Sequence, residues 1–348
     1  MNDIERIHSA YLAHPAVQTD TRKLRAGEIF FALKGPNFNG NSFARQALDA
    51  GAAAVVVDED QGITDPRLFL VADALKALQD LALEHRKTLK IPVLAITGSN
   101  GKTTTKELIH TVLSTTFRTS TTQGNLNNQI GVPLTLLAIK PDAEIAVVEL
   151  GANHQLEIEG YCRYTLPTHG IITNNGKDHL EGYGSIEGVR KGNGELYDHL
   201  RTHGGVAFVM TDYDDLRNMS AGISRIVSYG THDAQITGIV HSCTPLLEVL
   251  MTGGTGSKHI PTRLIGDYNL PNVLAAVAVG EHFGVDEEKI ASAISSYQPS
   301  NNRSQLVHRG TNKIFLDAYN ANPSSMQAAI ENFARQHDPG KVLVLGGM

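Results

Sequence analysis

The feature that most constrains this chain is a glycine-containing turn between an apolar run and an amphipathic segment. The run Ile91–Ile96 predicts a buried strand, and the turn follows at residues 98–103. Leu108, Ile109, Val112 and Leu113 then recur at helical spacing. A strand, a glycine turn and a helix in this order direct backbone N–H groups and a helix N-terminus at a phosphate. We therefore expect an α/β domain that binds a nucleotide.

The residue types in the turn fit that role. Gly98 and Gly101 allow the backbone to approach an anion, because they carry no Cβ. Lys102 supplies a positive charge for terminal phosphates, and the hydroxyl of Thr103 suits a magnesium ion. The alternative is an ordinary glycine-rich turn with an exposed lysine, but strand, glycines, lysine and threonine all fall in register. Only two residues separate the glycines, whereas the common phosphate loop has four.

The segment Thr97–Glu107, TGSNGKTTTKE, resembles the ATP loop of the Mur ligases, which build the peptide of peptidoglycan. Within that family it is most similar to members that add D-alanyl-D-alanine to UDP-N-acetylmuramoyl-tripeptide. The resemblance implies ATP and Mg²⁺ as cofactors and these two substrates as partners. It also implies three α/β domains, of which the central one has a mostly parallel P-loop-type sheet and the C-terminal one is Rossmann-like. The loop residues predicted to bind ATP are Gly98, Ser99, Asn100, Gly101, Lys102, Thr103 and Thr104.

Length and composition agree with such an enzyme. A chain of 348 residues should form two or three domains, and a net charge of -6 argues against general nucleic-acid binding. Cys162 and Cys243 form neither a disulfide framework nor a metal pattern, which fits a reducing cytosol. The sequence has no secretory signal and no run near the ~20 apolar residues of a membrane span. We expect a cytoplasmic monomer that binds neither nucleic acid nor membrane.

Residues 1–88 are predicted to form a small N-terminal domain that binds the UDP-sugar peptide. Apolar runs predict strands in Gly27–Gly35, Ala52–Glu59 and Leu68–Val71, with helices at 43–51 and 74–87. The segment TDTR resembles the family's sugar-nucleotide segment, and an arginine beside two hydroxyls suits a diphosphate. A capped loop with a surface arginine is the alternative. The TDTR residues are Thr19, Asp20, Thr21 and Arg22, and a second, less specific loop lies at Phe38, Asn39 and Gly40.

Residues 89–302 are predicted to form the central ATP-binding domain. Glu149 ends the strong strand in Ala143–His154 and so lies where open α/β sheets keep their ligands. We interpret it as a magnesium ligand, and the alternative is a solvated strand-end carboxylate. His179 follows a strand predicted to end at Thr173, and it resembles the family's metal-site histidine, although a lone histidine is usually structural. The predicted metal site is Thr103, Glu149 and His179, and the predicted catalytic residues are Lys102, Glu149 and His179.

Two further polar segments belong to this domain. Residues 122–137 resemble a family loop over the ATP phosphates and the acyl acceptor, and the alternative is a polar turn before a helix near Pro133. Its candidate substrate-binding residues are Asn125, Asn127 and Asn128. Asn269 and Asn272 match the family's Asn-x-x-Asn pair at the adenine, where an amide can read a purine edge. Tyr268 stands where the family often has histidine.

Residues 303–348 are predicted to begin the C-terminal ligase domain, with a strand ending at Asp317 and a helix from about Pro323. The resemblance assigns Arg303 and Asp317 to ATP, with Arg303 reaching the γ-phosphate, and Asn320 and Asn322 to the substrate. VLVLGG, residues 342–347, is expected to be the second strand of this domain. The family's domain is longer, so we expect this one to be incomplete.

The sequence departs from the family at two positions. Asn193 stands where the family has a carbamylated lysine that serves the second magnesium, and Gly347 stands where it usually has aspartate. A neutral amide brings no charge, so the second metal is predicted to be weak. Asp178, commonly a small residue, adds a carboxylate near the presumed metals.

The resemblance implies an ATP-dependent amide ligase that forms an acyl phosphate during peptidoglycan synthesis. Three alternatives stay open: a folylpolyglutamate-synthase-like or other Mur-type ligase, a catalytically impaired nucleotide-binding homologue, and a simple P-loop kinase. The TDTR segment and the Asn-Ala-Asn-Pro stretch argue against the first, and the sugar-nucleotide segment is unexplained by the last. Asn193 and Gly347 favour the impaired homologue.

Overall fold

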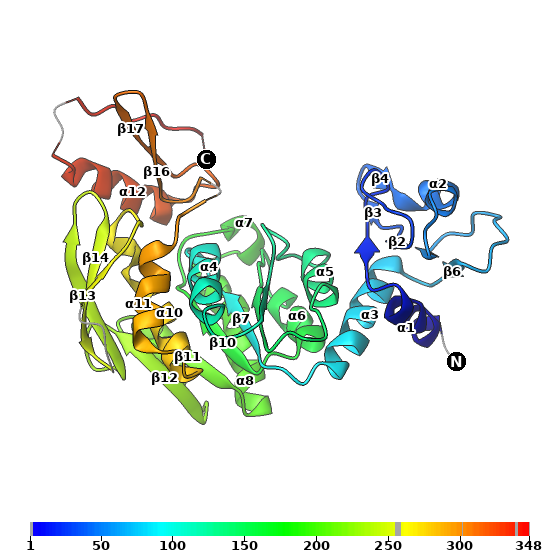
Figure 1. The fold of residues 1–348 in the computed structure, drawn as a ribbon, viewed down its shortest axis with the longest axis horizontal. Coiled ribbons are helices and arrows are strands. Elements are labelled where there is room, and N and C mark those ends of the chain that lie inside the picture. Colours follow the sequence, from blue (N-terminus) through cyan, green and yellow to red (C-terminus); the bar gives the residue numbers. More distant parts are fainter. Residues whose placement is uncertain (1–2, 255–258, 301, 338–339, 348) are drawn as a thin grey trace. The chain divides into compact units, whose positions relative to one another are not determined.

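The computed structural model describes residues 3–254, 259–300, 302–337 and 340–347. The chain forms two compact units, and each contains segments that are not contiguous in the sequence (Figure 1). Unit 1 comprises Met1–Ile91, Thr122–Asp142 and Gly160–Leu166, and unit 2 comprises Pro92–Thr121, Ala143–Glu159 and Pro167–Met348. The three-domain division at 88/89 and 302/303 stays a prediction.

The core of unit 1 is a parallel four-stranded sheet in the order β1-β2-β5-β6. Every side chain of β2 and β5 is buried, and Phe30, Leu48 and Val55 share one apolar cluster. This arrangement confirms the three strands and the two helices predicted for this part of the chain. The elements are β1 (Val17–Gln18), β2 (Ile29–Phe31), α2 (Ala44–Asp49), β5 (Ala54–Val57), β6 (Leu68–Leu70) and α3 (Ala74–Thr88).

Helix α3 also explains why residues 122–142 and 160–166 belong to unit 1. With α1 (Asp3–Ala13) it packs near α5 (Gly131–Leu137), and the hydroxyl of Tyr11 donates to the carbonyl of Leu137 at 2.6 Å. Arg86 is buried, and its Nε donates to the carbonyl of Thr165 at 2.8 Å. A buried guanidinium that satisfies distant carbonyls fixes these segments in one unit.

Unit 2 is built on a nine-stranded sheet in the order β15-β14-β13-β12-β11-β10-β7-β9-β8. The strands from β13 to β8 are parallel, and β14 runs antiparallel to its two neighbours, β13 and β15. The strands are β7 (Val93–Thr97), β8 (Thr119–Thr121), β9 (Ile145–Glu149), β10 (His169–Ile172), β11 (Val206–Met210), β12 (Arg225–Gly230), β13 (Ile236–Cys243), β14 (Leu247–Gly253) and β15 (His259–Pro261). The predicted α/β architecture with a mostly parallel central sheet is therefore confirmed.

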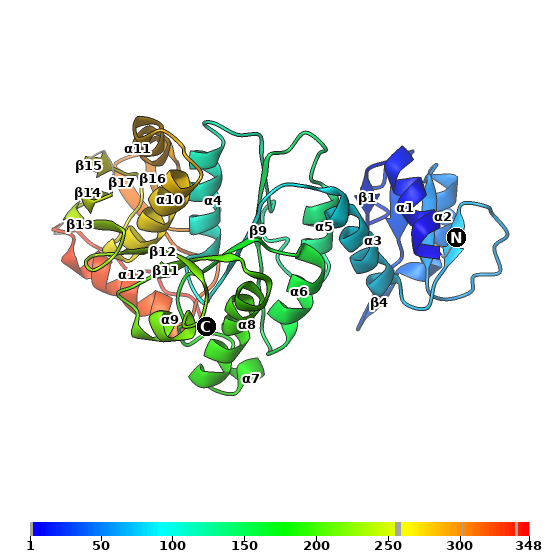
Figure 2. The ribbon, with the colours of Figure 1, turned by 90° about the horizontal axis from the view of Figure 1, so that it is seen from below.

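Helices cover both faces of this sheet (Figure 2). α4, α10 and α11 lie on one face and contact each other, whereas α8 and α9 lie on the other face. Because β7, β9 and β11 are buried along their whole length, they read in the sequence as continuous apolar runs. The helices of unit 2 are α4 (Lys102–Leu113), α7 (Leu180–Tyr183), α8 (Ile186–His203), α9 (Asp214–Met219), α10 (Leu270–His282) and α11 (Glu287–Ser296). α6 (Glu157–Thr165) begins in unit 2 and continues in unit 1.

The C-terminal segment forms a hairpin and one helix. β16 (Gln305–Arg309) pairs antiparallel with β17 (Asn312–Leu316), and α12 (Pro323–Arg335) follows. The predicted strand ending near Asp317 and the helix from Pro323 are confirmed. The predicted strand at 342–347 is wrong: residues 341–347 form no strand, and Val342 and Val344 are 76% and 88% exposed. An apolar run becomes a strand only where a neighbouring strand can pair with it. No described helix has the length and apolarity of a membrane span.

Candidate active site

The turn between β7 and α4 needs glycine at both predicted positions. Gly98 has φ +127°, and a Cβ there would lie 2.2 Å from Thr173 Oγ1. Gly101 has φ +82°, and a Cβ there would lie 2.6 Å from Asn272 Oδ1. Side chains at either position would meet both backbone strain and a clash. The loop is thus packed closely between the segment after β10 and the start of α10.

The segment after β10 holds the loop through hydrogen bonds. The N–H of Ser99 donates to the carbonyl of Asn174 at 2.9 Å, and the N–H of Asn100 donates to Asn174 Oδ1 at 3.0 Å. Thr173 Oγ1 donates to the carbonyl of Asn100 at 2.6 Å. Ser99 Oγ donates to Asp178 Oδ1 at 2.5 Å, and Asp178 is buried. Asp178 therefore anchors the loop, a role that sequence reasoning missed.

Lys102 is the first residue of α4 and folds back over the loop. Its Nζ donates to the carbonyls of Gly98 and, at 3.0 Å, Ser99. Burial lowers the pKa of Lys102, while the negative charges of Glu149 and Asp178 act in the opposite direction. The ammonium is held beside the backbone of the loop, and Thr104 in the same turn is half-buried.

Thr103 and Glu149 meet at the carboxyl ends of the central strands, as predicted. Glu149 is the last residue of β9 and is 1% exposed, and Thr103 Oγ1 donates to its Oε1 at 3.2 Å. Lys106, one turn further along α4, is fully buried and its Nζ lies 4.0 Å from Glu149 Oε2. Lys106 also lies 2.8 Å from Glu107 Oε1. Two adjacent hard oxygen donors fit Mg²⁺, and the sequence reading did not anticipate the buried lysine.

His179 lies in the segment between β10 and α7. It is exposed, has φ +45° and immediately precedes α7. The preceding residue, Asp178, is buried, whereas His179 is exposed. The role of His179 at a metal stays a prediction.

Asn269 and Asn272 form a buried chain of amides at the start of α10. Asn269 Nδ2 donates to the carbonyl of Ile265 at 2.8 Å, and Asn272 Nδ2 donates to Asn269 Oδ1 at 2.8 Å. Thr105 Oγ1 then donates to Asn272 Oδ1 at 3.0 Å. These contacts tie α10 to α4 directly beneath the loop. Contact of the pair with adenine stays a prediction.

Asn193 on α8 is also buried, with 3% exposure. Its Oδ1 accepts from Thr97 Oγ1 at 3.1 Å, and its Nδ2 donates to Asn175 Oδ1 at 2.9 Å. Asn175 Nδ2 in turn donates to Asp215 Oδ2 at 2.9 Å. The amide of Asn193 thus links the end of β7, the segment after β10 and α9.

The C-terminal segment contributes one contact to the loop. Asn322 Nδ2 donates to Asn100 Oδ1 at 2.8 Å, while the Asn322 side chain also caps α12. The guanidinium of Arg303 lies 3.6 Å from the ring centroid of Tyr319, and its buried Nε has no hydrogen-bond partner among the described residues. Asp317 and Asn320 are exposed; Asp317 Oδ1 accepts from the N–H of Ser304 at 3.4 Å.

In unit 1, the predicted diphosphate arginine is paired with its own segment. Arg22 donates to Asp20 through Nε and Nη2, both at 2.8 Å, and this bidentate bond lowers the pKa of Asp20 to about 2. Gln18 Oε1 accepts from the N–H of Thr19 and of Asp20. Thr21 is half-buried, and the Arg22 side chain is 86% exposed. The guanidinium is therefore accessible and held in a fixed orientation.

The three asparagines before α5 differ in their surroundings. Asn128 Oδ1 accepts from the N–H groups of Ile130 and Gly131, at 3.1 and 2.9 Å, so it closes the turn that leads into α5. Asn125 is exposed and Asn127 is half-buried. The contacts of Asn128 match the polar-turn alternative, and a role in substrate binding stays a prediction for all three.

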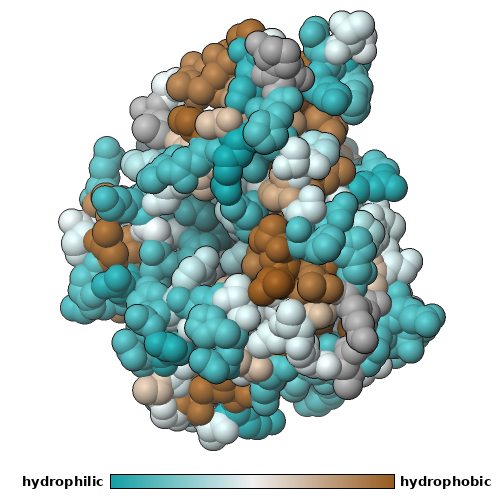
Figure 3. Space-filling model, turned by 90° about the vertical axis from the view of Figure 1, so that its left-hand side faces the viewer, coloured by the Kyte–Doolittle hydropathy of each residue, from teal (hydrophilic) through white to brown (hydrophobic). Residues whose placement is uncertain are grey.

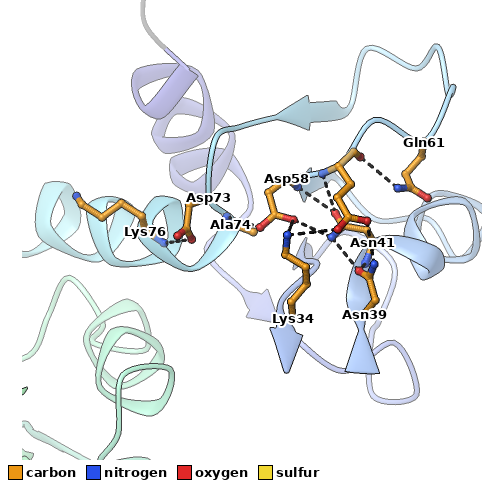
Figure 4. Close-up of polar contacts among 9 residues, drawn as sticks. Lys34, Asn39, Asn41, Asp58, Gln61, Asp73, Ala74 and Lys76 are labelled. Carbon is orange, nitrogen blue, oxygen red and sulfur yellow. Dashed lines mark hydrogen bonds and ion pairs between the residues drawn. The ribbon is translucent and has the colours of Figure 1, made fainter. Parts of the chain in front are cut away.

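A polar network supports the loop that the sequence predicts as a second sugar-nucleotide segment (Figure 4). Asn41 is fully buried; its Nδ2 donates to Asn39 Oδ1 and to Asp58 Oδ1, and its Oδ1 accepts from the N–H of Asp58. Lys34 Nζ lies 3.1 Å from Asp58 Oδ1. The short hairpin β3 (Lys34–Gly35) and β4 (Phe38–Asn39) is thereby fixed to the end of β5.

Comparison with known proteins places this geometry in a family. The model of the Mur ligase middle domain matches residues 96–280, and that of the Mur ligase family catalytic domain matches residues 15–97. The chain belongs to the Mur ligase family.

Similar individual proteins carry more specific names than the family does. UDP-N-acetylmuramoyl-tripeptide--D-alanyl-D-alanine ligase of Bacillus subtilis is 38% identical over 338 residues, which are 95% of this chain and 73% of that protein. MurF from Acinetobacter baumannii superposes with a TM-score of 0.85 at 32% identity, covering 92% of this chain and 71% of that one. MurF from Thermotoga maritima in complex with ADP superposes with a TM-score of 0.81 at 25% identity, covering 96% of this chain and 76% of that one.

Proposed function

We propose that this chain is an ATP-dependent ligase that joins D-alanyl-D-alanine to UDP-N-acetylmuramoyl-tripeptide in cytoplasmic peptidoglycan synthesis. The observation that carries the proposal is the phosphate loop between β7 and α4, with Lys102 folded over it and Thr103 beside Glu149. It occurs in a chain 38% identical, over 95% of its length, to a ligase of that name. A general P-loop kinase would leave this similarity unexplained.

The two units suggest a division of binding tasks. Unit 2 carries the loop, the Thr103–Glu149 pair and Arg303, so it binds ATP. Unit 1 carries Arg22 and the supported hairpin, so it binds the UDP-sugar peptide. An exposed guanidinium already held in a bidentate geometry can exchange its carboxylate partner for a phosphate with little loss of side-chain entropy.

Within the ATP site, this chain's residues hold and neutralise charge. The N–H groups of the loop and the N-terminus of α4 face the phosphates, and Lys102 adds a full positive charge. Thr103 and Glu149 would hold a magnesium ion, which when bound neutralises charge on the β- and γ-phosphates. Arg303, whose buried Nε has no hydrogen-bond partner among the described residues, would contact the γ-phosphate. Asn269 and Asn272 hold α10 against α4. They would thereby position the end of the site that receives the adenine.

The reaction needs positioning rather than a protein nucleophile. A carboxylate oxygen of the tripeptide's terminal residue attacks the γ-phosphorus, and the bond to the β-phosphate oxygen breaks to release ADP. The amine of D-alanyl-D-alanine then attacks the acyl carbon and loses a proton, and inorganic phosphate leaves. Preorganised charge and orientation account for such catalysis, and they match a site rich in asparagine, glycine, lysine and carboxylate.

One assay tests the proposal directly. Phosphate release is measured with UDP-N-acetylmuramoyl-tripeptide, ATP and Mg²⁺, with and without D-alanyl-D-alanine. We expect release that depends on both substrates, and none from Lys102→Ala, with unchanged circular dichroism. A second candidate, a homologue that binds nucleotide without turnover, is favoured by the neutral amide of Asn193. Saturable ATP binding without phosphate release under any substrate combination would select it and reject the ligase.

A further inference from the structure

Three metal-binding side chains converge on the antiparallel edge of the unit 2 sheet. His241 lies on β13, Glu248 on β14 and His259 on β15. One ligand atom from each lies within 4.8 Å of the other two, and no other such group of three His, Cys, Asp or Glu side chains occurs among the described residues. His259 Nε2 is 3.0 Å from Glu248 Oε2, and the rings of His241 and His259 lie 5.1 Å apart.

Strand register explains why Glu248 and His259 share one face. Glu248 pairs with Pro261 on β15, and the next residue pair on that face is Leu250 with His259. On β13 the register shifts between Val240 and Ser242, so His241 is the extra residue of a β-bulge and lies with Ser242 opposite Glu248. From that position a ligand atom of His241 lies within 4.8 Å of those of Glu248 and His259.

We propose that His241, Glu248 and His259 bind one divalent transition-metal ion of the Zn²⁺ class, with water completing the coordination. Two imidazole nitrogens and one carboxylate oxygen form a ligand set that suits Zn²⁺, whereas Mg²⁺ and Ca²⁺ prefer oxygen alone. At metal–ligand distances of about 2.0–2.2 Å, two ligands on a tetrahedral ion lie about 3.4 Å apart. At 3.0 Å, the His259 Nε2–Glu248 Oε2 distance is close to that spacing, and exposed His241 needs only a side-chain adjustment.

A simple ion pair between His259 and Glu248 is the competing account. It would use two of the three side chains and would leave the bulged His241 without a role. The metal account uses all three and crosslinks three adjacent strands, including the edge strand β15. An ion there would stabilise this edge and so suppress its fraying.

This site is separate from the phosphate loop. β15 is six strands along the sheet from β7, which corresponds to on the order of 30 Å at the usual strand spacing of about 4.8 Å. His241 and His259 are exposed, so the site opens to solvent. The surface on this side is mainly hydrophilic, with separate apolar patches (Figure 3). The ion would therefore act on stability and leave the ligase reaction itself unchanged.

The test is a Zn²⁺ titration of chelator-treated protein by calorimetry, in excess Mg²⁺ so that hard oxygen sites are filled. We expect one Zn²⁺ per chain, a rise in melting temperature with Zn²⁺, and visible absorption bands of tetrahedral Co²⁺ when cobalt replaces zinc. Because loss of even outer-shell partners costs about 10–100-fold in metal affinity, His241→Ala and His259→Ala should each weaken this site at least about tenfold. Glu248→Gln should do the same.

His232→Ala is the matched control. His232 is also exposed and lies 3.6 Å from a carboxylate oxygen of Asp212, but no third ligand joins this pair in the part of the chain that the structure describes. We expect zinc affinity and the cobalt spectrum to be unchanged in this variant. The proposal is overturned if His241→Ala retains the affinity of the parent chain, or if His232→Ala weakens binding as much as His259→Ala, which would indicate dispersed binding to the chain's 15 histidines. Circular dichroism confirms that each variant is folded.

Discussion

Replacing Lys106 by methionine tests the charge balance beneath the phosphate loop. The side chain is fully buried, and its Nζ lies 4.0 Å from Oε2 of Glu149, which is 1% exposed. Methionine is also unbranched and flexible, so it can occupy the same space. The substitution therefore removes one buried positive charge while changing the packing of α4 little.

The expected cost follows from the distance. Two unit charges 4.0 Å apart interact by about 4 kcal/mol at an effective dielectric constant of about 20. Breaking a buried pair by removing one partner typically costs about 3–5 kcal/mol. We therefore expect Lys106→Met to lower the free energy of unfolding by about 4 kcal/mol. Adding Glu149→Gln should recover about 2 kcal/mol of this, because the amide still accepts from Thr103 and carries no charge.

The assay is urea unfolding of the parent, both single variants and the double variant. Circular dichroism is the appropriate probe, because the chain has no tryptophan. Since Thr103 and Glu149 are proposed to hold Mg²⁺, the loss in Lys106→Met should be smaller in Mg²⁺ than in chelator. If the losses of the two single variants simply add in the double variant, Lys106 and Glu149 are not coupled and the reasoning is refuted.

Three further predictions concern the loop, pH and unit 1. Gly101→Ala should weaken ATP binding, measured by calorimetry, because its Cβ would lie 2.6 Å from Asn272 Oδ1. Gly184→Ala is the control: Gly184 has φ +77°, but a Cβ there would meet no atom within 4 Å, so this variant adds backbone strain alone. Burial lowers the pKa of His169 to about 4, so its contribution to stability is complete above pH 6.5 and declines as pH falls towards 4. His169 alone should contribute a loss of about 2 kcal/mol between pH 7 and 5, so melting curves of His169→Gln should show a loss smaller than that of the parent by about this amount. Arg22→Ala should raise KM for the UDP-sugar peptide and leave ATP affinity unchanged; an equal loss of ATP affinity would contradict the assigned role of unit 1.

The phosphate loop was predictable because its determinants are local. The two glycines, Lys102 and Thr103 lie within six residues, and the structure gives each the conformation or neighbour that its spacing implied. Glu149 was predictable for a related reason: a buried strand reads as an apolar run, and its last residue lies at the sheet edge where ligands bind. Local patterns therefore fixed both the loop and its partner strand.

The residues that the sequence reading missed depend on contacts between distant parts of the chain. Asp178 accepts a hydrogen bond from Ser99, which lies 79 positions earlier in the sequence, and no local pattern near either residue predicts this contact. The sequence did not single out Lys106, and only the packing of α4 on the sheet buries it. His241 lies at a β-bulge where two residues of β13 oppose Glu248. Such contacts follow from topology and register, which composition and periodicity do not contain.

Asn193 shows how the structure changes the meaning of a departure noticed in the sequence. Taken alone, an amide in place of a charged ligand predicts a weak second metal. In the structure both ends of that amide are engaged: Thr97 at the end of β7 donates to it, and it donates to Asn175, whose own amide bonds Asp215. An amide offers a donor and an acceptor on one planar group, and both are used here. Asn193 therefore does more than lack a charge. It forms a neutral link between the strand that leads into the loop and the helices on the opposite face, so it supports the loop whatever the occupancy of the predicted second metal site.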